Sequence, residues 1–568
     1  MILSKLRIEN FRGLTSLEIE LDRTTVLVGE NNTGKTSVLE ALHIVLSRSL
    51  ARRAAPFTEY DFHLATDQSE PASAEPIALT VIFEESNKDE WPDEIVQAFP
   101  NAIQTFDDGR QLLSFRVTAS YDKVIQDVAV EWAFLDQAGN PLPTAKQTAL
   151  VTELQQLAPV FLLSAVRDAA QHFGARSSFW SPFTKNPDIA QDRRAEIEEQ
   201  IAQVNQSVLD SHKPFEVVRE RIAQVGKLVP LAGGDLVSVE AVPGRILDML
   251  SRTQVKLAAR TGARLPLAYH GSGTQSLSVL FLFEAFLLSR LAGAYDTHSE
   301  PILALEEPEA HLHPSAIRAL WSTLDSLGGQ KIIATHSGDL LAAVPLQAIR
   351  RLARKSDRIQ VFRVGSNTLD STEARRVIYH IRAKRGALLF ARCWLLVEGE
   401  TEFTLLPELA RILGHDLDLT GVCCVEFAQC GLRPLIKVAK DLGIEWHVLA
   451  DGDRSGQRYA ATARSFLGGE NESVRITGFP EPDIEHSFWN AGYESVYETA
   501  VDANHTAMVT ASKGTAQYTS ETINAAVKST SKPHLAYAVA SEAAVRGPSG
   551  IPSPLKVAIE TAVTLAAT

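Results

Sequence analysis

Two pairs of carboxylates stand at the ends of short apolar segments in the second half of the chain. In HVLADGDRSG, a single glycine separates Asp451 from Asp453, and in CWLLVEGETEF, Glu398 and Glu402 follow a similar apolar segment. Carboxylates this close repel each other unless a cation neutralises them, and an all-oxygen set suits Mg²⁺ or Mn²⁺ better than zinc. The residue types therefore predict a divalent-metal site.

Both motifs fit the ends of strands in a parallel sheet. The period of two in an extended segment leaves Asp451 and Asp453 on the same side, and Gly452 lets the backbone turn between them. If a helix begins just after the other strand, Glu398 lies at its tip and Glu402 about one turn along it. The carboxyl ends of parallel strands converge on a crevice, so we expect the four carboxylates to meet there. The alternative is a solvated loop with helix-capping acids.

A third motif follows an apolar strand near the N-terminus. VLVGENNTGKTS matches the phosphate-loop pattern G-x-x-x-x-G-K-[ST]. Its glycines let the backbone wrap round phosphate oxygens, Lys35 supplies charge to the terminal phosphates, and Thr36 supplies a hydroxyl for Mg²⁺. The predicted nucleotide-binding residues of this loop are Gly29, Asn31, Asn32, Gly34, Lys35, Thr36 and Ser37.

Three later segments are expected to complete the nucleotide site. PILALEEPEAHLHP is an apolar strand that ends in Glu306, placed to hold the metal shell, and Glu307, placed to orient the attacking water. KIIATHSGD ends a second strand at His336, which is positioned to touch the γ-phosphate or, as strand-end histidines often do, only forms a structural hydrogen bond. In YHGSGTQSLSVL, Ser272 and Gly273 precede a helix and offer a second backbone anion site.

In their order and spacing, and with the opening LSKLRIENFRGL, these segments resemble the ABC-type ATPase heads of the structural-maintenance-of-chromosomes and RecF group. The resemblance implies that Ser272 and Gly273 of one subunit face the nucleotide held by Lys35 of another, and hence a homodimer. Two departures are visible: the signature is GSGTQ rather than LSGGQ, and Glu306 stands where many such ATPases have Asp. The longer carboxylate favours ATP binding over fast hydrolysis.

The motif EGxxE followed by DxD resembles the Toprim domain of topoisomerases, primases and some nucleases. An ABC head followed by a Toprim domain in one chain resembles the OLD (overcoming lysogenization defect) family of nucleases. The resemblance implies metal-dependent DNA cleavage by two metal ions under nucleotide control, with ATP and Mg²⁺ at the head. A role in phage defence or DNA repair would follow. The implied Toprim metal residues are Glu398, Glu402, Asp451 and Asp453.

Further ligands and a catalytic cation are expected beyond these motifs. In GFPEPDIEHSFW, Asp483 and Glu485 follow another apolar segment, and Glu485 is the preferred ligand. Ser455 is placed to bond a metal-bound water or a phosphate, or only to shape the turn. Lys532 is the candidate that adds positive charge to the pentacovalent phosphate. Its competitors are Lys513, Lys528 and Lys556.

The predicted fold class is α/β, with an ABC-type P-loop ATPase head, a helical insertion and a Toprim domain. The insertion is amphipathic, which suits a dimerisation element or a helix lying on its own domain. The expected boundaries are a discontinuous head at 1–165 and 243–365, the insertion at 166–242, a basic connector at 366–390, and a Toprim domain at 391–568 with an Ala/Ser/Thr-rich helical C-terminal part.

The net charge of −14 argues weakly against nucleic acid as a partner, but the charge is unevenly spread. Residues 346–392 contain twelve Lys or Arg against three acids, which suits sequence-independent contacts with DNA phosphates. The alternative is a solvated helix face. The basic residues singled out are Arg350, Arg351, Arg354, Lys355, Arg358, Arg375, Arg376, Arg382, Lys384 and Arg385.

No membrane partner is expected, and the predicted location is the cytoplasm. The longest apolar run, LSVLFLFEAFLLSRLAG, is interrupted by Glu284 and Arg290, which favours a buried helix. The N-terminus shows no secretory pattern, and four cysteines in so long a chain suit buried thiols in a reducing compartment.

Two other functions remain open on the sequence. A non-cleaving, ATP-gated DNA-binding mediator of recombination explains the head but leaves the convergent carboxylates without a task. A nuclease that ignores ATP would use the head only for assembly. The sequence does not indicate whether an accessory protein takes part.

Overall fold

The structure of the chain is a computed structural model, and it falls into two compact units. The first comprises 1–162, 300–309 and 314–568, and the second 163–299 and 310–313. Most of the predicted insertion, together with Lys384 and Arg385, lies outside the described residues. The residues that the structure describes are 1–47, 56–64, 66, 70–124, 126–143, 147–164, 189–211, 214, 216–217, 241–251, 253–258, 262–289, 295, 298–356, 358–383 and 386–568.

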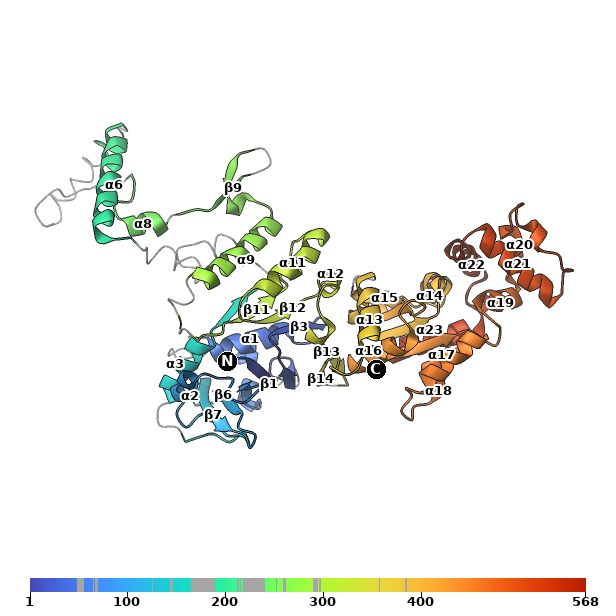
Figure 1. The fold of residues 1–568 in the computed structure, drawn as a ribbon, viewed down its shortest axis with the longest axis horizontal. Coiled ribbons are helices and arrows are strands. Elements are labelled where there is room, and N and C mark those ends of the chain that lie inside the picture. Colours follow the sequence, from blue (N-terminus) through green and yellow to red (C-terminus); the bar gives the residue numbers. More distant parts are fainter. Residues whose placement is uncertain are drawn as a thin grey trace, which may run out of the picture. The chain divides into compact units, whose positions relative to one another are not determined.

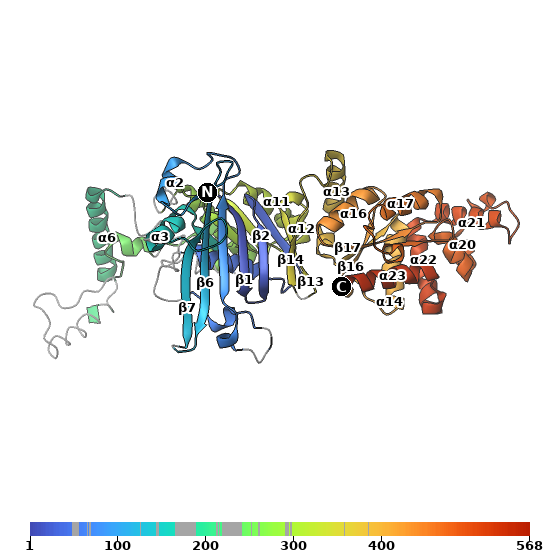
Figure 2. The ribbon, with the colours of Figure 1, turned by 90° about the horizontal axis from the view of Figure 1, so that it is seen from below.

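An antiparallel sheet begins the first unit, and its strands stand side by side in Figure 2. Along β1 and β2 buried residues largely alternate with more exposed ones, as a sheet with one covered face requires, whereas β4 is buried along most of its length. The strands, in sheet order, are β2 (Leu14–Glu20), β1 (Leu3–Phe11), β4 (Ile77–Glu84), β6 (Gln111–Asp122) and β5 (Gln104–Thr105), and β7 (Asp127–Leu135) also pairs with β6.

A second sheet carries the phosphate loop. Strands β11, β12, β3 and β13 are parallel neighbours. All residues of β12 and most of β3 and β11 are buried, as expected of strands covered on both faces, whereas β13 (IRRLARK) is rich in basic residues. The order is β14 (Arg358–Phe362), β13 (Ile349–Lys355), β3 (Thr24–Gly29), β12 (Gln330–Ala334), β11 (Ile302–Glu306) and β8 (Val160–Leu163). Helix α1 (Lys35–Leu46) follows β3, α11 (Pro314–Ser326) connects β11 to β12, and α12 (Gly338–Leu341) lies between β12 and β13.

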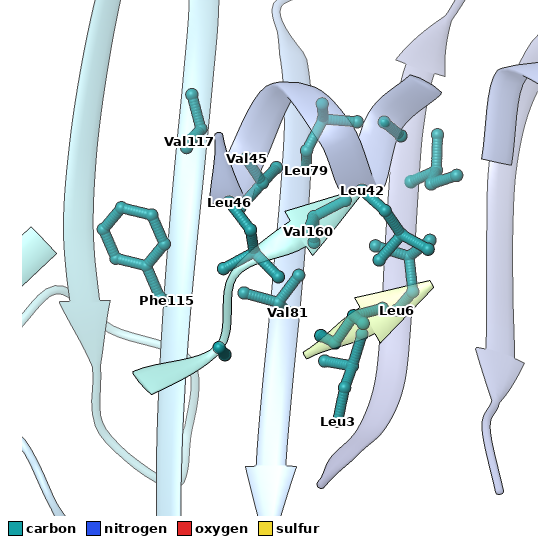
Figure 3. Close-up of a cluster of buried hydrophobic side chains, with 14 of the residues drawn as sticks. Leu3, Leu6, Leu42, Val45, Leu46, Leu79, Val81, Phe115, Val117 and Val160 are labelled. Atoms are coloured by element: carbon teal, nitrogen blue, oxygen red, sulfur yellow. The ribbon is translucent and has the colours of Figure 1, made fainter. Parts of the chain in front are cut away.

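The core of this region fixes the helix that starts at the phosphate loop (Figure 3). Leu42, Val45 and Leu46 of α1 pack in one buried cluster with Leu79 and Val81 of β4, Phe115 and Val117 of β6, and Val160 of β8. Truncating one such leucine to alanine typically costs about 2–5 kcal/mol. The core therefore anchors α1 through its C-terminal half.

The predicted Toprim region, residues 391–568, contains a separate parallel sheet in the same unit, and it is coloured from orange to red in Figure 1. Alternate residues Cys393, Leu395 and Val397 join the core formed with the following helices, and Trp394 and Leu396 are buried on the other face. The order is β16 (Val422–Glu426), β15 (Cys393–Val397), β17 (Glu445–Ala450) and β18 (Ile476–Gly478). Cys424 and Cys430, like Cys393, are buried thiols.

Helices dominate the Ala/Ser/Thr-rich C-terminal part of the chain. Small residues such as Ala536, Ala540 and Ala543 let these helices pack closely in the Toprim core. The α-helices of the region are α14 (Glu400–Ile412), α15 (Leu417–Thr420), α16 (Leu432–Asp441), α17 (Arg454–Arg464), α18 (Glu472–Arg475), α19 (Ile484–Phe488), α20 (Glu494–Ala500), α21 (Ala516–Ser529), α22 (Lys532–Arg546) and α23 (Ser553–Ala566), and α13 (Ser371–Ala383) precedes the sheet.

The second unit contains α6 (Gln191–Ser211), α8 (Ile246–Ser251), the hairpin β9 (Lys256–Ala258) and β10 (Arg264–Pro266), and α9 (Ser272–Ser289). On α6, Ile201 is buried, while Val204 and Val208 are exposed. Among the described helices, α9 alone has the length and composition to cross a membrane, which is weak evidence because core helices share both. Its buried residues include Val279, Phe283 and Phe286.

Candidate functional site

The phosphate loop connects the end of β3 to the start of α1 through two glycines that no other residue replaces easily. Gly29 has φ +152°, and an added Cβ would lie 2.3 Å from the carbonyl oxygen of Leu352. Gly34 has φ +87°, and its Cβ would lie 2.6 Å from a methyl carbon of Leu14. The loop backbone therefore requires glycine at both positions.

Within the loop, the polar groups have protein partners. The buried Lys35 ammonium donates hydrogen bonds to the carbonyl oxygens of Gly29 (2.8 Å) and Glu30 (2.7 Å). Burial lowers the pKa of Lys35 to about 8. The Thr36 hydroxyl donates to the carboxylate of Glu306 at the end of β11. Asn31 and Asn32 are exposed and Ser37 is half-buried.

Glu307 and His336 lie beside each other next to this loop. Glu307 has φ +43°, a left-handed backbone conformation that is costly for a non-glycine residue, and its N–H donates to the carbonyl of Ala334 (2.8 Å). The His336 Nε2 atom lies 4.0 Å from the Glu307 carboxylate. Burial and the nearby Lys35 charge lower the pKa of His336, which favours the neutral imidazole.

The sequence did not single out Glu309, which supports this strand end. Its Oε1 accepts hydrogen bonds from the Thr335 hydroxyl and from the backbone N–H of His336 (3.3 Å). Burial raises the pKa of Glu309, and its Oε2 has no hydrogen-bond partner among the described residues. In sequence it is one acid among several in EEPEAH, so no local signal distinguishes it.

Ser272 and Gly273 begin α9 in the second unit. A Cβ at Gly273 would lie 2.7 Å from the carbonyl oxygen of His311, so this helix start passes close to another backbone segment. The predicted contact of these two residues with a nucleotide on a partner subunit stays a prediction.

In the Toprim sheet, Glu398 and Asp451 directly follow two neighbouring parallel strands, β15 and β17. Glu402 lies in the first turn of α14, where its Oε2 accepts a hydrogen bond from the Gly399 N–H (3.2 Å). Asp453 is the N-cap of α17 and accepts from the backbone N–H of residue 456 (2.7 Å). Two of the four acids are therefore helix-capping residues, as the alternative interpretation held.

Electrostatic repulsion nevertheless couples these acids. Burial, then the charges of Glu402, Glu398, Asp483 and Glu485, raises the pKa of Asp451 to about 8. Burial, and after it the charge of Glu485, raises the pKa of Glu402 to about 7. Burial and the acidic neighbours make these carboxyl groups harder to ionise than in water, so a cation bound among them would favour their charged forms.

Glu398 also belongs to this acidic space, because its charge raises the pKa of Asp451. Its Oε2 is buried and has no hydrogen-bond partner among the described residues. Burial and the charge of Asp453 raise its pKa. Among the described residues no three His, Cys, Asp or Glu side chains already form a metal-binding group, so an ion would have to draw the carboxylates together.

Glu485 and Lys532 extend this acidic space. The buried Glu485 accepts a hydrogen bond from the Thr401 hydroxyl (3.3 Å), and the Lys532 ammonium lies 3.9 Å from the Glu485 carboxylate. Burial raises the pKa of Glu485 against the opposing charge of Lys532. The competing Lys513 pairs instead with Glu498 (2.6 Å).

Ser455 and Asp483 have protein partners of their own. The Ser455 hydroxyl accepts a hydrogen bond from Arg458 (2.9 Å). Asp483 caps α19 and accepts from the backbone N–H (2.8 Å) and the Nδ1 (2.6 Å) of His486. Although burial opposes the change, these hydrogen bonds lower the pKa of Asp483. The loop that carries it presses against Gly452, where a Cβ would lie 2.2 Å from a carbonyl oxygen.

The basic stretch is less uniform than its sequence indicated. Arg350 and Arg351 are only 1% and 3% exposed. Arg350 bonds Asp22 (2.6 Å), and Arg351 donates to backbone carbonyls of the Toprim region. The prediction that these two arginines contact DNA was wrong, because their guanidinium groups are used inside the protein. Those still exposed are Arg354, Arg358, Arg375, Arg376 and Arg382.

Two family models match consecutive parts of the chain. The family model described as "Protein of unknown function (DUF2813)" matches residues 1–387. A second, described as "Overcoming lysogenization defect protein-like, TOPRIM domain", matches residues 389–453.

Three relatives match most of the chain. An uncharacterized protein, YbjD, of Escherichia coli (strain K12) is 31% identical over 563 residues, which is 98% of this chain and 97% of that protein. The OLD nuclease of Thermus scotoductus is 26% identical over 471 residues, 80% of this chain and 82% of that one. The endonuclease GajA of Bacillus cereus is 21% identical over 487 residues, 82% and 78% of the two chains.

Proposed function

Because the chain belongs to the DUF2813 family and carries the OLD-like Toprim domain that its motifs predicted, we propose that it is a divalent-metal-dependent DNA endonuclease with an ATP-binding head. The names of two relatives, OLD nuclease and endonuclease GajA, support this activity and DNA as the substrate. A cytoplasmic homodimer that acts in phage defence or DNA repair completes the proposal.

The observation that carries the proposal is the excess of carboxylate charge at the ends of β15 and β17. The pKa of Asp451 is raised to about 8, and a buried oxygen of Glu398 has no hydrogen-bond partner among the described residues. Both features disappear if divalent cations bind there, because a cation accepts lone pairs and offsets the repulsion. If these acids served only as helix caps, a buried carboxylate oxygen without a partner, such as that of Glu398, would serve no purpose.

When bound, two such ions supply an activated water and stabilise the leaving oxygen of a phosphodiester bond. Glu398, Glu402, Asp451 and Glu485 are the proposed ligands, with Asp453 and Ser455 at the rim. Lys532, exposed at the start of α22 and 3.9 Å from the Glu485 carboxylate, adds positive charge beside the crowded phosphate.

At the head, Lys35 and Thr36 are proposed to bind the phosphates and Mg²⁺ of ATP together with Glu306. The bond between Thr36 and Glu306 supports this, because both side chains belong to the expected metal shell. Glu307 would orient the attacking water and the neutral His336 would contact the γ-phosphate. Ser272 and Gly273 of a second copy would close the site.

One observation favours a second candidate, a non-cleaving ATP-gated DNA-binding mediator. No group of side chains among the described residues is already arranged to hold a metal ion. If ions never bind at the Toprim acids, the head and the exposed arginines would still allow nucleotide-gated DNA binding.

The test is conversion of supercoiled plasmid to nicked and linear DNA by the purified protein with Mg²⁺ or Mn²⁺, with and without ATP. Wild type should cut, Asp451→Asn should not, and Lys35→Ala should lose any response to ATP. Cutting by Asp451→Asn would place the activity elsewhere. DNA binding without cutting by wild type would favour the mediator, and equal rates with and without ATP would remove nucleotide control.

A further inference from the structure

A two-point ion pair joins the phosphate loop to the Toprim sheet. Arg392 donates from one terminal nitrogen to Oε2 of Glu30 (2.7 Å) and from Nε to Oε1 of the same carboxylate. Glu30 is the first loop residue after β3, and Arg392 directly precedes β15. The hydrogen bond from Arg392 lowers the pKa of Glu30, so the pair is charged at neutral pH.

Two more contacts reach the same edge of the Toprim sheet. The buried Arg351, on the strand next to β3, donates to the carbonyl of Ala391 (2.8 Å) before β15 and to that of Leu442 (3.0 Å) shortly before β17. Lys355 pairs with Glu445 (2.7 Å), the first residue of β17. The head thus contacts the beginnings of the two strands whose far ends carry the proposed metal ligands.

Strands β15 and β17 are suited to transmit a displacement. Every residue of β15 is fully buried, and β17 is its parallel neighbour. Five residues of strand span roughly 17 Å. Because a close-packed interior moves as a unit rather than compressing, a shift at Arg392 would be felt at Glu398.

The phosphate loop has a direct means of moving Glu30. The Lys35 ammonium donates to the carbonyl oxygens of Gly29 and Glu30, and a phosphate bound in the loop competes for the same protons. When Lys35 turns to the phosphate, the Glu30 carbonyl loses its donor. The backbone hydrogen bonding of Glu30 therefore changes, and the side chain of Glu30 is the one that pairs with Arg392.

We propose that Glu30 and Arg392 form a positioning pair through which nucleotide at the phosphate loop shifts the carboxylates at the ends of β15 and β17. The use of those carboxylates in cleavage rests on the proposed function, but the coupling itself does not require cleavage. The pair is about half exposed, with 48% of the Arg392 and 40% of the Glu30 side chain accessible, so its effect is expected in coupling rather than in stability.

The experiment is hydrogen exchange of the backbone amides of residues 393–402, measured at constant Mg²⁺ with and without a non-hydrolysable ATP analogue. In wild type the analogue should change these exchange rates about fivefold or more, the lower end of typical allosteric coupling. Arg392→Gln and Glu30→Gln should lose most of this response while still binding a fluorescent ATP analogue.

A matched control is available on the antiparallel sheet. Arg7 pairs with Glu18 at comparable exposure, 46% and 47%, so Arg7→Gln removes a similar ion pair and should keep the full response. The charge-swapped double variant Glu30→Arg with Arg392→Glu should recover part of it. If Arg392→Gln does not fold, Glu30→Gln and Arg392→Lys test the same contact.

A full nucleotide response in both Arg392→Gln and Glu30→Gln overturns the proposal, and so does the absence of a response in wild type. These outcomes are separate from the proposed function. Wild type that shows the response but cuts no DNA refutes the nuclease and leaves the coupling standing. If wild type cuts DNA but nucleotide does not change hydrogen exchange at residues 393–402, the coupling is refuted and the nuclease stands.

Discussion

The phosphate loop and the Toprim acids are both polar sites at strand ends, yet their charges are balanced in different ways. In the loop, Lys35 bonds two backbone carbonyls and Thr36 bonds Glu306. At the Toprim acids, Glu398 keeps a buried oxygen without a partner among the described residues, and the pKa of Asp451 is raised. The polar groups of the loop are satisfied by its own side chains, whereas we propose that the acids are balanced only when a cation binds.

The largest expected effect is a loss of activity that accompanies a gain of stability. Asp451→Asn removes a ligand and should lower metal-dependent cleavage about 100-fold or more. The same change removes like-charge repulsion and should raise the free energy of unfolding by about 1–3 kcal/mol. Plasmid cleavage and thermal unfolding measure the two effects, and a destabilised variant would contradict the comparison.

Lys35→Ala should act in the opposite direction on stability. Without the ammonium, the carbonyls of Gly29 and Glu30 lose their donor, which should lower the free energy of unfolding by about 1–3 kcal/mol. Nucleotide binding should also be lost. Titration of a fluorescent ATP analogue and denaturant unfolding check both points, and unchanged stability would show that the loop is not held by Lys35.

The pH dependence of stability should distinguish the two sites. The folded-state pKa values of Asp451 and Glu402, about 8 and about 7, lie above their ordinary values, so the folded protein binds more protons than the unfolded chain. This contribution to stability is fully present at low pH and is lost as pH rises through about 7 to 8. Unfolding between pH 5 and about 8.5 should show a decline that is weaker in Asp451→Asn. If the free energy of unfolding declines equally in both proteins, the pH dependence does not come from Asp451.

Mg²⁺ should raise the melting temperature of wild type by several degrees at saturating concentration, because a ligand that binds only the folded state stabilises it. Asp451→Asn should gain much less. Scans with Mg²⁺ and with EDTA, each without nucleotide, isolate the Toprim acids from the head. Equal shifts in both proteins would place the cation elsewhere.

The smallest effect is expected from two aspartates in the same local arrangement. Asp483 and Asp502 each bond the histidine three residues later, at 2.6 and 2.7 Å. Only Asp483 contributes to the raised pKa of Asp451. Because Asp483 lies beside the proposed metal ligands, Asp483→Asn should reduce cleavage by roughly 10-fold, while Asp502→Asn should leave it unchanged. Equal effects in the plasmid assay would deny Asp483 a place at the site.

The sequence allowed prediction of features that depend on local pattern. The α/β fold class and the resemblance to the OLD family are confirmed. Both could be predicted because the motifs at strand ends are short segments whose residues and order can be recognised in the sequence alone. Glu398 and Asp451 follow their strands as expected. The roles assigned to Glu307, His336 and Lys532 stay predictions.

Other features depend on contacts between distant segments. Nothing in the neighbourhood of Arg392 indicates that it bonds Glu30, which lies 362 positions away. Composition alone cannot distinguish the buried Arg350 and Arg351 from the exposed Arg354, so a basic stretch was interpreted as one DNA-binding surface. Burial decides which arginines are available to DNA: Arg350 is held by Asp22 within the head, and Arg351 by backbone carbonyls of the Toprim region.

The central claim is that the Toprim carboxylates form a divalent-cation site, and direct Mn²⁺ binding tests it most simply. Electron paramagnetic resonance would count the bound Mn²⁺ in wild type, Asp451→Asn and Glu398→Gln, each without nucleotide. The account predicts saturable binding in wild type that both variants weaken at least about 10-fold. Equal Mn²⁺ binding by all three proteins would contradict it.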